Sequence, residues 1–370
     1  MDPDAVDDLR SGAGDTSSAD ATSPDSEGDG SGENREMQNG LGSGRVPHGS
    51  SEDPHLLDFS ANTNPNRPEG VAQVYEAALS VAHSYPSADY DQFRAAAAEY
   101  VGCDATDVIP TAGGLVAIRL TIATTVESGD DVLVPAPSFG EYAREVRLQG
   151  GTPRFVPHDE VLDADPAEFA LVVVCTPNNP TGDACDPDRL RAFADHCRDA
   201  GTPLLVDEAF IDFTHLPTLA GRDGVVVARS LTKIFGLPGL RGGFAVATGE
   251  YRDRLETARL SWGVGTVAAA VGTHCLGETA FIEETRERVA SERARMRERL
   301  STRFTVSPSD APFLLLDCGS TEMVDDLLET VRKHDIAIRD ARTFRGLDQH
   351  VRVAVRLPDE NDRLLNALDV

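Results

Sequence analysis

Residues 230–243 of this 370-residue chain read SLTKIFGLPGLRGG and contain Lys233. Among the 34 basic residues, only Lys233 and Lys333 are lysines, and all the others are arginines. Lys233 follows VVVARS, an apolar run typical of a buried strand, and enters a loop rich in Gly and Pro. Arginine can replace lysine as a surface charge, but it has no nucleophilic amine that forms a Schiff base with an aldehyde. Lys233 is therefore a candidate for amine chemistry, with chance survival as the alternative that we expect for Lys333.

Apolar runs on both sides of Lys233 predict a largely parallel sheet. They are short, rich in Val and Leu and without alternation, which is typical of strands buried on both faces. The runs are DDVLVPAPSF (130–139), ALVVVCTPNNP (170–180), TPLLVDEAF (202–210), GVVVARS (224–230) and GGFAVATG (242–249). Helical patterns lie between them at GLVAIRLTIATTVESG (114–129) and DPDRLRAFADHCRDAG (186–201). This order predicts an α/β layered domain whose ligands meet the carboxyl ends of the strands.

A smaller unit follows a long charged helix near the C-terminus. Its strand–helix–strand–strand–helix pattern is FLLLDCG (313–319), TEMVDDLLETVRKHD (321–335), IAIRD (336–340), VRVAVR (351–356) and DENDRLLNAL (359–368). We expect a disordered acidic tail (1–45), an N-terminal arm (46–85), a large cofactor-binding domain (86–262), a connecting helix region (263–300) and a small C-terminal domain (301–370), with a cleft between the domains. Residues 1–36 hold eleven acidic residues, two arginines and no aromatic residue, too little apolar surface to offset the entropy of ordering. Met37 is an alternative start.

The charge of the chain restricts its partners. It has 62 acidic residues against 34 basic ones, a formal net charge of −28, which argues against nucleic acid and anionic membranes. Two interpretations remain: a surface for a basic partner, and adaptation to concentrated salt, where the Debye length falls to ~3 Å at 1 M. The replacement of lysine by arginine favours adaptation to concentrated salt. No apolar run approaches the ~20 residues that cross a bilayer, so we expect a cytoplasmic protein. The six cysteines form no metal-binding motif, and we expect free thiols and no metal.

Polar residues at the ends of the expected strands could build a site around Lys233. Asp207 ends a buried run, where its charge would need a cationic partner such as a ring nitrogen. Asn179 lies in TPNNPTG, for which an ordinary turn is the alternative. PTAGGLVAIRL places small residues before a helix, whose amino end favours a phosphate, although capping alone would also explain it. Ser230 and Arg241 lie close enough in the chain to reach the same anion.

From about His48 to the C-terminus, the chain resembles the fold-type I pyridoxal-phosphate enzymes of the class I/II aminotransferase family. The motifs that carry the resemblance, in this order and spacing, are TPNNPTG, VDEAF, SLTK and GLRGG. The resemblance implies an α/β fold with a large domain on a mostly parallel sheet and a smaller C-terminal α/β domain. It implies that Lys233 forms a Schiff base with pyridoxal 5'-phosphate, that Asp207 keeps the ring nitrogen protonated and that Asn179 bonds the ring hydroxyl. The cofactor phosphate would be held by Ala112, Gly113, Gly114, Ser230 and Arg241.

Three further roles follow from the resemblance. Phe139 in PSFGEY would stack on the cofactor ring. Tyr85 in SYPSADY would reach the cofactor phosphate of a neighbouring subunit, which implies a homodimer. Arg352 in VRVAVR would grip the substrate carboxylate. The phosphate loop departs from the family, whose members usually carry a polar or acidic residue where this chain has Gly114 or Leu115, so backbone contacts survive there and side-chain contacts do not.

Within the family, the chain resembles the threonine-phosphate decarboxylases of cobalamin biosynthesis in three stretches. These are LLDFSANTNPNRP, DEAFIDF and ARSLTKIFGLPGLRGGF. The alternative is a histidinol-phosphate aminotransferase, in which a tyrosine is expected where Phe210 stands. Both kinds of enzyme act on a phosphorylated substrate, for which we expect contacts from Arg339, Arg352 and Asn64. The bond that breaks depends on which substituent of Cα is held perpendicular to the ring, and spacing along the chain leaves this open. A second alternative is a relative that binds the cofactor without turnover.

Overall fold

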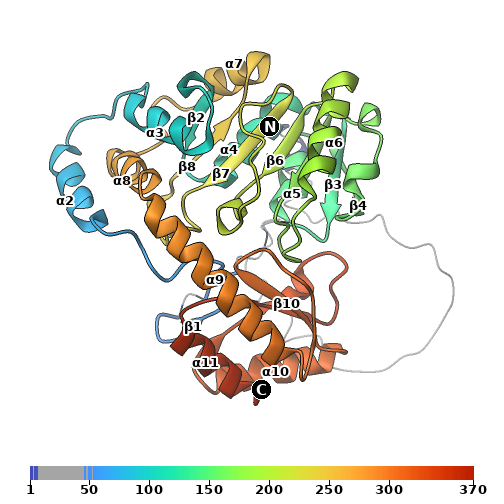
Figure 1. The fold of residues 1–370 in the computed structure, drawn as a ribbon. Helices are drawn as coiled ribbons and strands as arrows, with labels where there is room; N and C mark the ends of the chain where they lie inside the picture. Colours follow the sequence, from blue (N-terminus) through green and yellow to red (C-terminus); the bar gives the residue numbers. More distant parts are fainter. Residues whose placement is uncertain (3, 7–45, 47–48, 52) are drawn as a thin grey trace.

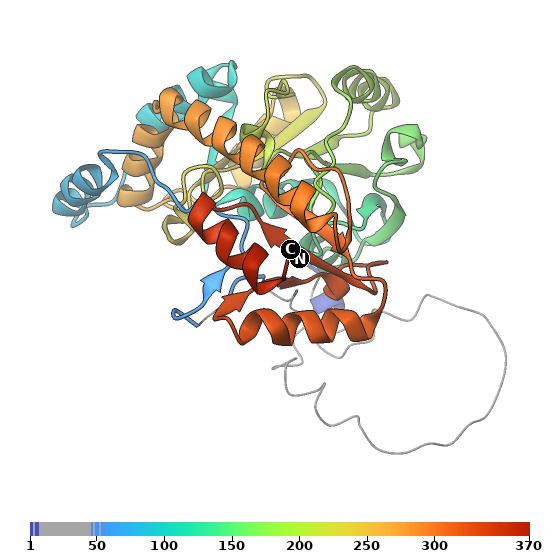
Figure 2. The same ribbon diagram turned by 60° about the horizontal axis from the view of Figure 1, so that its bottom comes forward.

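The computed structural model describes residues 1–2, 4–6, 46, 49–51 and 53–370. Figure 1 shows a large and a small α/β unit, with the long helix α9 (Thr279–Leu300) running from one to the other. The small unit, built mainly from the C-terminal residues, comes forward in Figure 2. The acidic tail expected over 1–45 lies almost entirely outside the described residues, so its state and boundary stay predictions.

The large unit is built on a seven-stranded sheet with the order β2-β8-β7-β6-β5-β3-β4. The strands are β2 (Val108–Thr111), β3 (Asp131–Ala136), β4 (Thr152–Pro157), β5 (Leu171–Cys175), β6 (Leu204–Asp207), β7 (Val225–Ser230) and β8 (Gly243–Val246). Neighbouring strands from β7 to β4 are parallel, whereas β8 is antiparallel to both β7 and β2. The prediction of a mostly parallel sheet is confirmed. The carboxyl ends of β5, β6 and β7 therefore lie side by side at one edge of the sheet.

Helices cover both faces of the large sheet. One face carries α4 (Gly114–Thr125), α5 (Glu141–Leu148) and α7 (Gly249–Ala258), and the other carries α3 (Asp91–Val101), α6 (Pro187–Ala200) and α8 (Thr266–Leu276). Along β5, Val172 and Val174 join the core on the α6 side, while Val173 and Cys175 join the core with α4 and α5. Both faces are apolar, which explains why these strands read as unbroken apolar runs.

Helix α6 shows how the sequence sets the ends of an element. Asp186 is its N-cap, and one carboxylate oxygen accepts from the N–H groups of Asp188 (3.0 Å) and Arg189 (2.9 Å). Pro187 occupies the first turn, where its missing N–H costs no hydrogen bond. Gly201 ends the helix with φ of 76°, a left-handed conformation that favours glycine. The stretch DPDRLRAFADHCRDAG thus forms the helix that its first and last residues predict.

The small unit has a four-stranded antiparallel sheet in the order β12-β13-β10-β9. Its elements are β9 (Thr305–Val306), β10 (Phe313–Asp317), α10 (Thr321–Arg332), β12 (Arg339–Asp340), β13 (His350–Ala354) and α11 (Pro358–Ala367). The run IAIRD, expected as one strand, is divided between two sheets. Its first half, β11 (Ile336–Ala337), pairs in parallel with β1 (Leu57–Asp58), so the N-terminal arm contributes a strand to this unit.

The region 263–300, expected to connect the two domains, contains α8 and α9. The arm also forms α2 (Val71–Val81), which projects at one edge of the molecule in both Figure 1 and Figure 2 and packs on α8. Across the residues that the structure describes, no helix combines the length and the apolar character required to span a bilayer.

Candidate active site

Lys233 lies in the loop that follows β7, at the carboxyl edge of the large sheet. Its carbonyl oxygen accepts a hydrogen bond from the N–H of Asn64 at 3.0 Å, which ties this loop to the N-terminal arm. Burial and the positive charge of Arg352 lower the pKa of Lys233 from 10.5 to about 8, although the carboxylate of Asp207 opposes the change. Roughly a tenth of the amine is therefore neutral at pH 7 and about half at pH 8, and the neutral form is the one that attacks a carbonyl carbon.

Asp207 ends β6 and is buried. One carboxylate oxygen, Oδ2, accepts from the hydroxyl of Tyr142 at 2.5 Å, and the other accepts from the N–H of Ala209 at 3.0 Å. Burial raises the pKa of Asp207, while the two hydrogen bonds and the charge of Lys233 act in the opposite direction. An ionised carboxylate in such a place is stable only with donors and a cation beside it, so the site is suited to a protonated ring nitrogen.

The loop between β2 and α4 and the loops around β7 and β8 approach one another closely at glycines. An added Cβ at Gly113, where φ is +98°, would lie 2.8 Å from Nη2 of Arg241, and one at Gly114 would lie 3.1 Å from Cβ of Ser230. At Gly243 it would lie 2.7 Å from the carbonyl oxygen of Arg229. Gly113 is the N-cap of α4 and has no side chain to cover the first N–H groups of the helix. These backbone donors, a hydroxyl and a guanidinium form a cradle suited to a phosphate.

Arg352 extends from β13 of the small unit to the site on the large one. It is buried, its Nη1 donates to Oδ1 of Asn179, and its Nη2 donates to the carbonyl oxygen of Ser60 at 2.9 Å. Its Nε has no hydrogen-bond partner among the residues that the structure describes. Burial and the charge of Arg339 lower the pKa of Arg352 from its ordinary value. A buried guanidinium with a spare donor favours the binding of an anion.

Arg339 is the direct cross-strand neighbour of Arg352 in the β12–β13 register. Its Nη2 donates to the hydroxyl of Thr343 at 2.8 Å. The two guanidinium carbons lie 5.3 Å and 5.7 Å from the centroid of the same ring, that of Phe344. The small unit therefore presents a pair of cations, an arrangement that matches a ligand with two anionic groups.

Asn64 is buried and uses both ends of its amide within the protein. Its Nδ2 donates to the carbonyl oxygen of Ile234 at 2.8 Å and to the hydroxyl of Thr285 at 3.2 Å. Its Oδ1 accepts from Nη2 of Arg288 at 2.7 Å. These bonds connect the loop after Lys233 with α9. The substrate contact expected of Asn64 stays a prediction, and this geometry gives the side chain a structural role.

Asn62 is a second buried amide in the same arm. Its Oδ1 lacks a hydrogen-bond partner within the described part of the chain. It lies between Ser60, whose carbonyl oxygen binds Arg352, and Asn64, whose N–H binds Lys233. An unsatisfied buried amide at this point of the arm is a candidate contact for a polar ligand.

Two aromatic side chains complete the set expected from the sequence. Phe139 is half-buried just before α5 and meets the ring of Tyr142 edge-on, with centroids 5.7 Å apart and an interplanar angle of 87°. Tyr85 is 82% exposed and packs on Trp262 with ring centroids 5.1 Å apart. Its contact with a neighbouring subunit stays a prediction.

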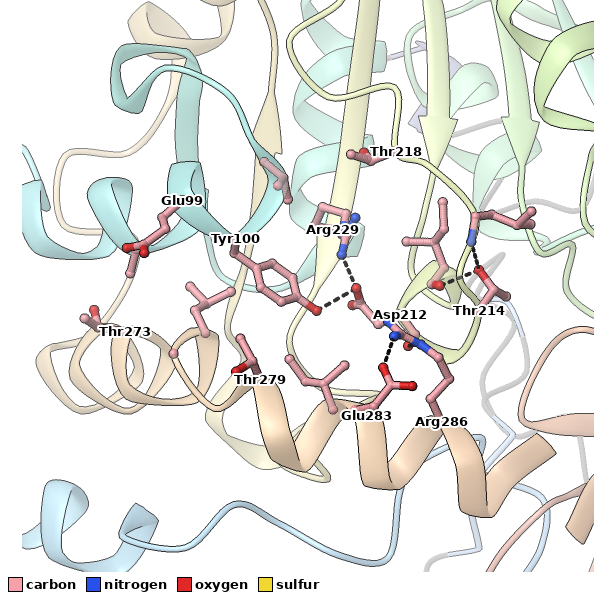
Figure 3. A pocket seen from close by; sticks show the side chains of 17 residues that line it. Glu99, Tyr100, Asp212, Thr214, Thr218, Arg229, Thr273, Thr279, Glu283 and Arg286 are labelled. Atoms are coloured by element: carbon pink, nitrogen blue, oxygen red, sulfur yellow. Dashed lines mark hydrogen bonds and ion pairs between the residues drawn. The ribbon is translucent and has the colours of Figure 1, made fainter. Parts of the chain in front are cut away.

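A separate cavity of about 720 Å³ lies between α3, α8, α9 and the segment after β6 (Figure 3). Arg229 lines it and bridges Oε2 of Glu208, at 2.9 Å, and the carboxylate of Asp212. Asp212 also accepts from the hydroxyl of Tyr100 at 2.6 Å. Because residues alternate along β7, Arg229 points to the opposite face of the sheet from Ser230. This ionic cluster supports the ends of β6 and β7 from behind.

The family model for aminotransferase class I and II matches residues 54–368. The chain belongs to this family. It is 33% identical to the threonine-phosphate decarboxylase of Salmonella typhimurium, over 85% of this chain and 90% of that one. It is 30% identical to histidinol-phosphate aminotransferase 2 of Archaeoglobus fulgidus, over 85% of this chain and 93% of that one. Among solved structures, the histidinol-phosphate aminotransferase of Clostridium acetobutylicum matches with a TM-score of 0.78 and 25% identity, over 85% of this chain and 98% of that one.

As a member of the aminotransferase class I and II family, the protein is an enzyme dependent on pyridoxal 5'-phosphate. The residues at the site fit this cofactor. Lys233 supplies an amine of lowered pKa, and Asp207 supplies a buried carboxylate that lacks a full counter-charge. The close approaches at Gly113 and Gly243 leave a cradle that a Cβ would fill. The roles of the individual residues stay predictions for this class I and II aminotransferase.

Two residues of this aminotransferase site went unnoticed in the sequence. Tyr142 ends the motif PSFGEY, and its position three residues after Phe139, at the start of a helix, was the available signal. Asn62 stands in SANTNP two residues before Asn64, and only the structure shows which of the two amides has a free end.

Proposed function

We propose that this enzyme is a threonine-phosphate decarboxylase, which removes CO2 from O-phospho-L-threonine. The observation that carries the choice is Phe210, whose ring centroid lies 5.8 Å from Nζ of Lys233 and which meets Phe313 edge-on at 5.2 Å. A histidinol-phosphate aminotransferase is expected to have a tyrosine here, with a hydroxyl directed at the cofactor. Without that hydroxyl, the amide of Asn179 is left as the main partner of the cofactor's ring oxygen.

The arginine pair supports a substrate with two anionic groups. O-phospho-L-threonine carries a carboxylate and a phosphate, and β12 and β13 present Arg339 and Arg352 side by side. The spare Nε of Arg352 adds a donor for an anionic group, and the unsatisfied Oδ1 of Asn62 adds an acceptor for a donor group of the substrate. In a protein of net charge −28, such a local concentration of positive charge is what allows an anionic substrate to bind.

The residues of the site would act on the substrate by orientation and proton transfer. Bound pyridoxal phosphate supplies an electron sink for the electron pair of a bond broken at Cα. Arg352 would hold the carboxylate so that its bond to Cα stands perpendicular to the cofactor ring, the geometry that favours loss of CO2. Lys233, with a pKa of about 8, can hold a proton near neutral pH and deliver it to Cα after CO2 has left.

A histidinol-phosphate aminotransferase is the second candidate. Relatives with this name match the chain about as well as the decarboxylase does. The arginine pair would also suit glutamate, an amino donor with two carboxylates. A relative that binds cofactor without turnover is disfavoured, because Lys233, Asp207 and Asn179 are all present around one site.

The test is to incubate the protein with pyridoxal phosphate and O-phospho-L-threonine in concentrated KCl. We expect CO2 release that needs no keto acid. Transfer of an amino group from glutamate to imidazole-acetol phosphate, without CO2 release, would replace the proposal by the second candidate. Phe210→Tyr is the matched variant: it restores the hydroxyl, and we expect a lower ratio of decarboxylation to transamination.

We further propose a cytoplasmic homodimer adapted to salt. Large apolar side chains are exposed along α2 and in two nearby loops, namely Tyr75, Leu79, Val81, Tyr85, Leu260 and Trp262. Such a patch on one chain suits a second copy of the same chain. Light scattering should give twice the mass of one chain for the native protein, and a smaller mass for Trp262→Glu. A native protein with the mass of one chain would exclude the dimer.

A further inference from the structure

We propose that the hydroxyl of Tyr142 is a positioning group that keeps Asp207 ionised and thereby keeps the ring nitrogen of the bound cofactor protonated. The proposal concerns the cofactor site and holds whichever substrate the enzyme uses. Tyr142 would act through Asp207 and touch neither substrate nor cofactor.

The geometry of Tyr142 is that of a fixed donor. Its side chain is completely buried, in the first turn of α5, and its Oη lies 2.5 Å from Oδ2 of Asp207. The edge-on contact with Phe139 restricts the tilt of its ring. Cys175, paired with Asp207 in the β5–β6 register, packs beside the same hydroxyl and carboxylate. A group held in this way loses little entropy when it donates to the carboxylate.

The proton of this hydrogen bond belongs to Tyr142. Burial, followed by the charge of Asp207, raises the pKa of Tyr142 well above its ordinary value. Burial likewise raises the pKa of the Cys175 thiol, which stays neutral. Across the working range of pH, Tyr142 is therefore a neutral donor and Asp207 is the acceptor.

The carboxylate needs this donor because its surroundings oppose its charge. Burial raises the pKa of Asp207, and the groups that act against burial are, in order, the Tyr142 hydroxyl, the Ala209 N–H and the charge of Lys233. The charge of Lys233 is weakened by its own lowered pKa. The Tyr142 hydrogen bond is then the main remaining support from a side chain. Without it, the proton shared with the cofactor moves from the ring nitrogen toward Asp207.

A purely structural role is the competing explanation, in which Tyr142 only fills the core between α5 and the sheet. Tyr142→Phe keeps the ring and removes the hydroxyl, so it separates the two roles. Cys175→Ala is the matched control, because it removes the thiol that contacts the Tyr142 hydroxyl and keeps both partners of the Tyr142–Asp207 hydrogen bond.

The experiment uses the holoenzyme loaded with pyridoxal phosphate labelled with ¹⁵N in the ring. The ¹⁵N chemical shift distinguishes a protonated pyridine from a neutral one. In the native protein and in Cys175→Ala we expect a protonated nitrogen, and in Tyr142→Phe a shift toward the neutral form. The dissociation constant of the cofactor should rise about tenfold in Tyr142→Phe, since a hydrogen bond to a charged group is lost. The value of kcat should fall more than KM changes.

Each outcome bears on the proposal. An unchanged ¹⁵N shift in Tyr142→Phe would leave only the structural role and would overturn the proposal. A shift of equal size in Cys175→Ala would also overturn it, because packing alone would then set the protonation. If Tyr142→Phe does not fold, the native holoenzyme still provides a test, because a neutral ring nitrogen at neutral pH would overturn the proposal.

Discussion

Lys233 combines three conditions that a reactive amine needs: burial, positive neighbours and a nearby carboxylate. Burial first, and then the positive charge of Arg352, lower its pKa to about 8. The rarity of lysine in the chain singled it out, and its position after a buried strand indicated the sheet edge. The partners were harder to predict. Asp207 ends a recognisable buried run and Asn179 stands in a recognisable turn, but the contact of Arg352 with Asn179 joins residues 173 positions apart. Such a contact depends on how two domains pack, which local sequence does not encode.

The two lysines of the chain form a matched pair for mutation. Lys233→Arg should abolish the visible absorbance of attached cofactor and reduce activity by at least about a thousandfold, because arginine cannot replace the amine. Lys333→Arg should change activity by less than about twofold, because Lys333 is exposed and only pairs with Glu329 on the surface of α10. Absorbance spectra and initial rates of both variants check this. Retained cofactor absorbance in Lys233→Arg would contradict the assignment.

The two buried amides of the arm should separate binding from stability. Asn62→Ala should raise KM about tenfold, the value of one hydrogen bond to a charged ligand, with little change in melting temperature. Asn64→Ala should lower the free energy of unfolding by about 2–3 kcal/mol, because its partners on α9 and in the Lys233 loop lose their hydrogen bonds. Steady-state kinetics and denaturant titrations provide the two readouts. A raised KM in Asn64→Ala together with a loss of stability in Asn62→Ala would instead assign the substrate contact to Asn64.

The pKa of Lys233 should appear in the rate at which apoprotein captures cofactor. The neutral amine is the reactive form, so the rate constant should rise with pH to a midpoint of about 8 and then level off. Arg352→Met removes a positive charge that disfavours the ammonium form, so the midpoint should move upward, toward 10.5. Arg342→Gln is the control, since Arg342 pairs with Asp325 and Asp340. Stopped-flow absorbance over a pH series measures the midpoint, and a downward shift in Arg352→Met would be inconsistent with this account.

At the scale of elements, apolar runs bounded by Gly, Pro and Asp located five strands of the large sheet, and capping residues located both ends of α6. The sheet's edge strands were less visible. β4 is partly exposed and reads TPRFVP, without the apolar continuity of the central strands. The division of IAIRD between two sheets could not be predicted either. It depends on β1, a two-residue strand from a distant part of the chain.

The close packing around the phosphate cradle can be tested at a glycine. Gly243→Ala would place a Cβ 2.7 Å from backbone atoms of Arg229, Gly113 and Gly114, so it should destabilise the protein by about 1–3 kcal/mol and weaken cofactor binding. Gly239→Ala, in the same loop, meets nothing within 4 Å and should stay within about 0.5 kcal/mol of the native protein. Thermal unfolding and cofactor titration compare the two. Equal stability of both variants would show that the backbone around Gly243 is not closely packed.

At the scale of the whole molecule, charge is the dominant property. The formal net charge of the full chain is −28, and eleven acidic residues against two arginines in residues 1–36 supply −9 of it. In the part of the chain that the structure describes, the buried arginines are Arg352 near Lys233, Arg229 behind β7, and Arg94 in α3. Repulsion between surface carboxylates opposes folding when salt is low. The active site itself is less sensitive to the salt concentration, because Arg352 and Asp207 are buried and dissolved ions screen their charges little.

Stability should therefore increase with salt. The melting temperature should rise between 0.1 M and 1 M KCl, as the Debye length falls from ~10 Å to ~3 Å. Differential scanning calorimetry of the holoprotein at several KCl concentrations measures this. Sucrose at matched osmolality is the control, since it does not screen charge. A melting temperature that is flat or falls with KCl would contradict the interpretation of the acidic surface.

The pairing of β1 with β11 has a consequence for how the molecule is made. Leu57 leaves the ribosome long before its partner Ile336, so every strand of the large sheet must be synthesised before this ladder can close. Until then the arm that binds Lys233 and Arg352 lacks its anchor, and a newly made chain cannot have a complete catalytic centre. Competence should thus arrive in a single late event, after the segment that carries Ile336 and Arg352 has been translated.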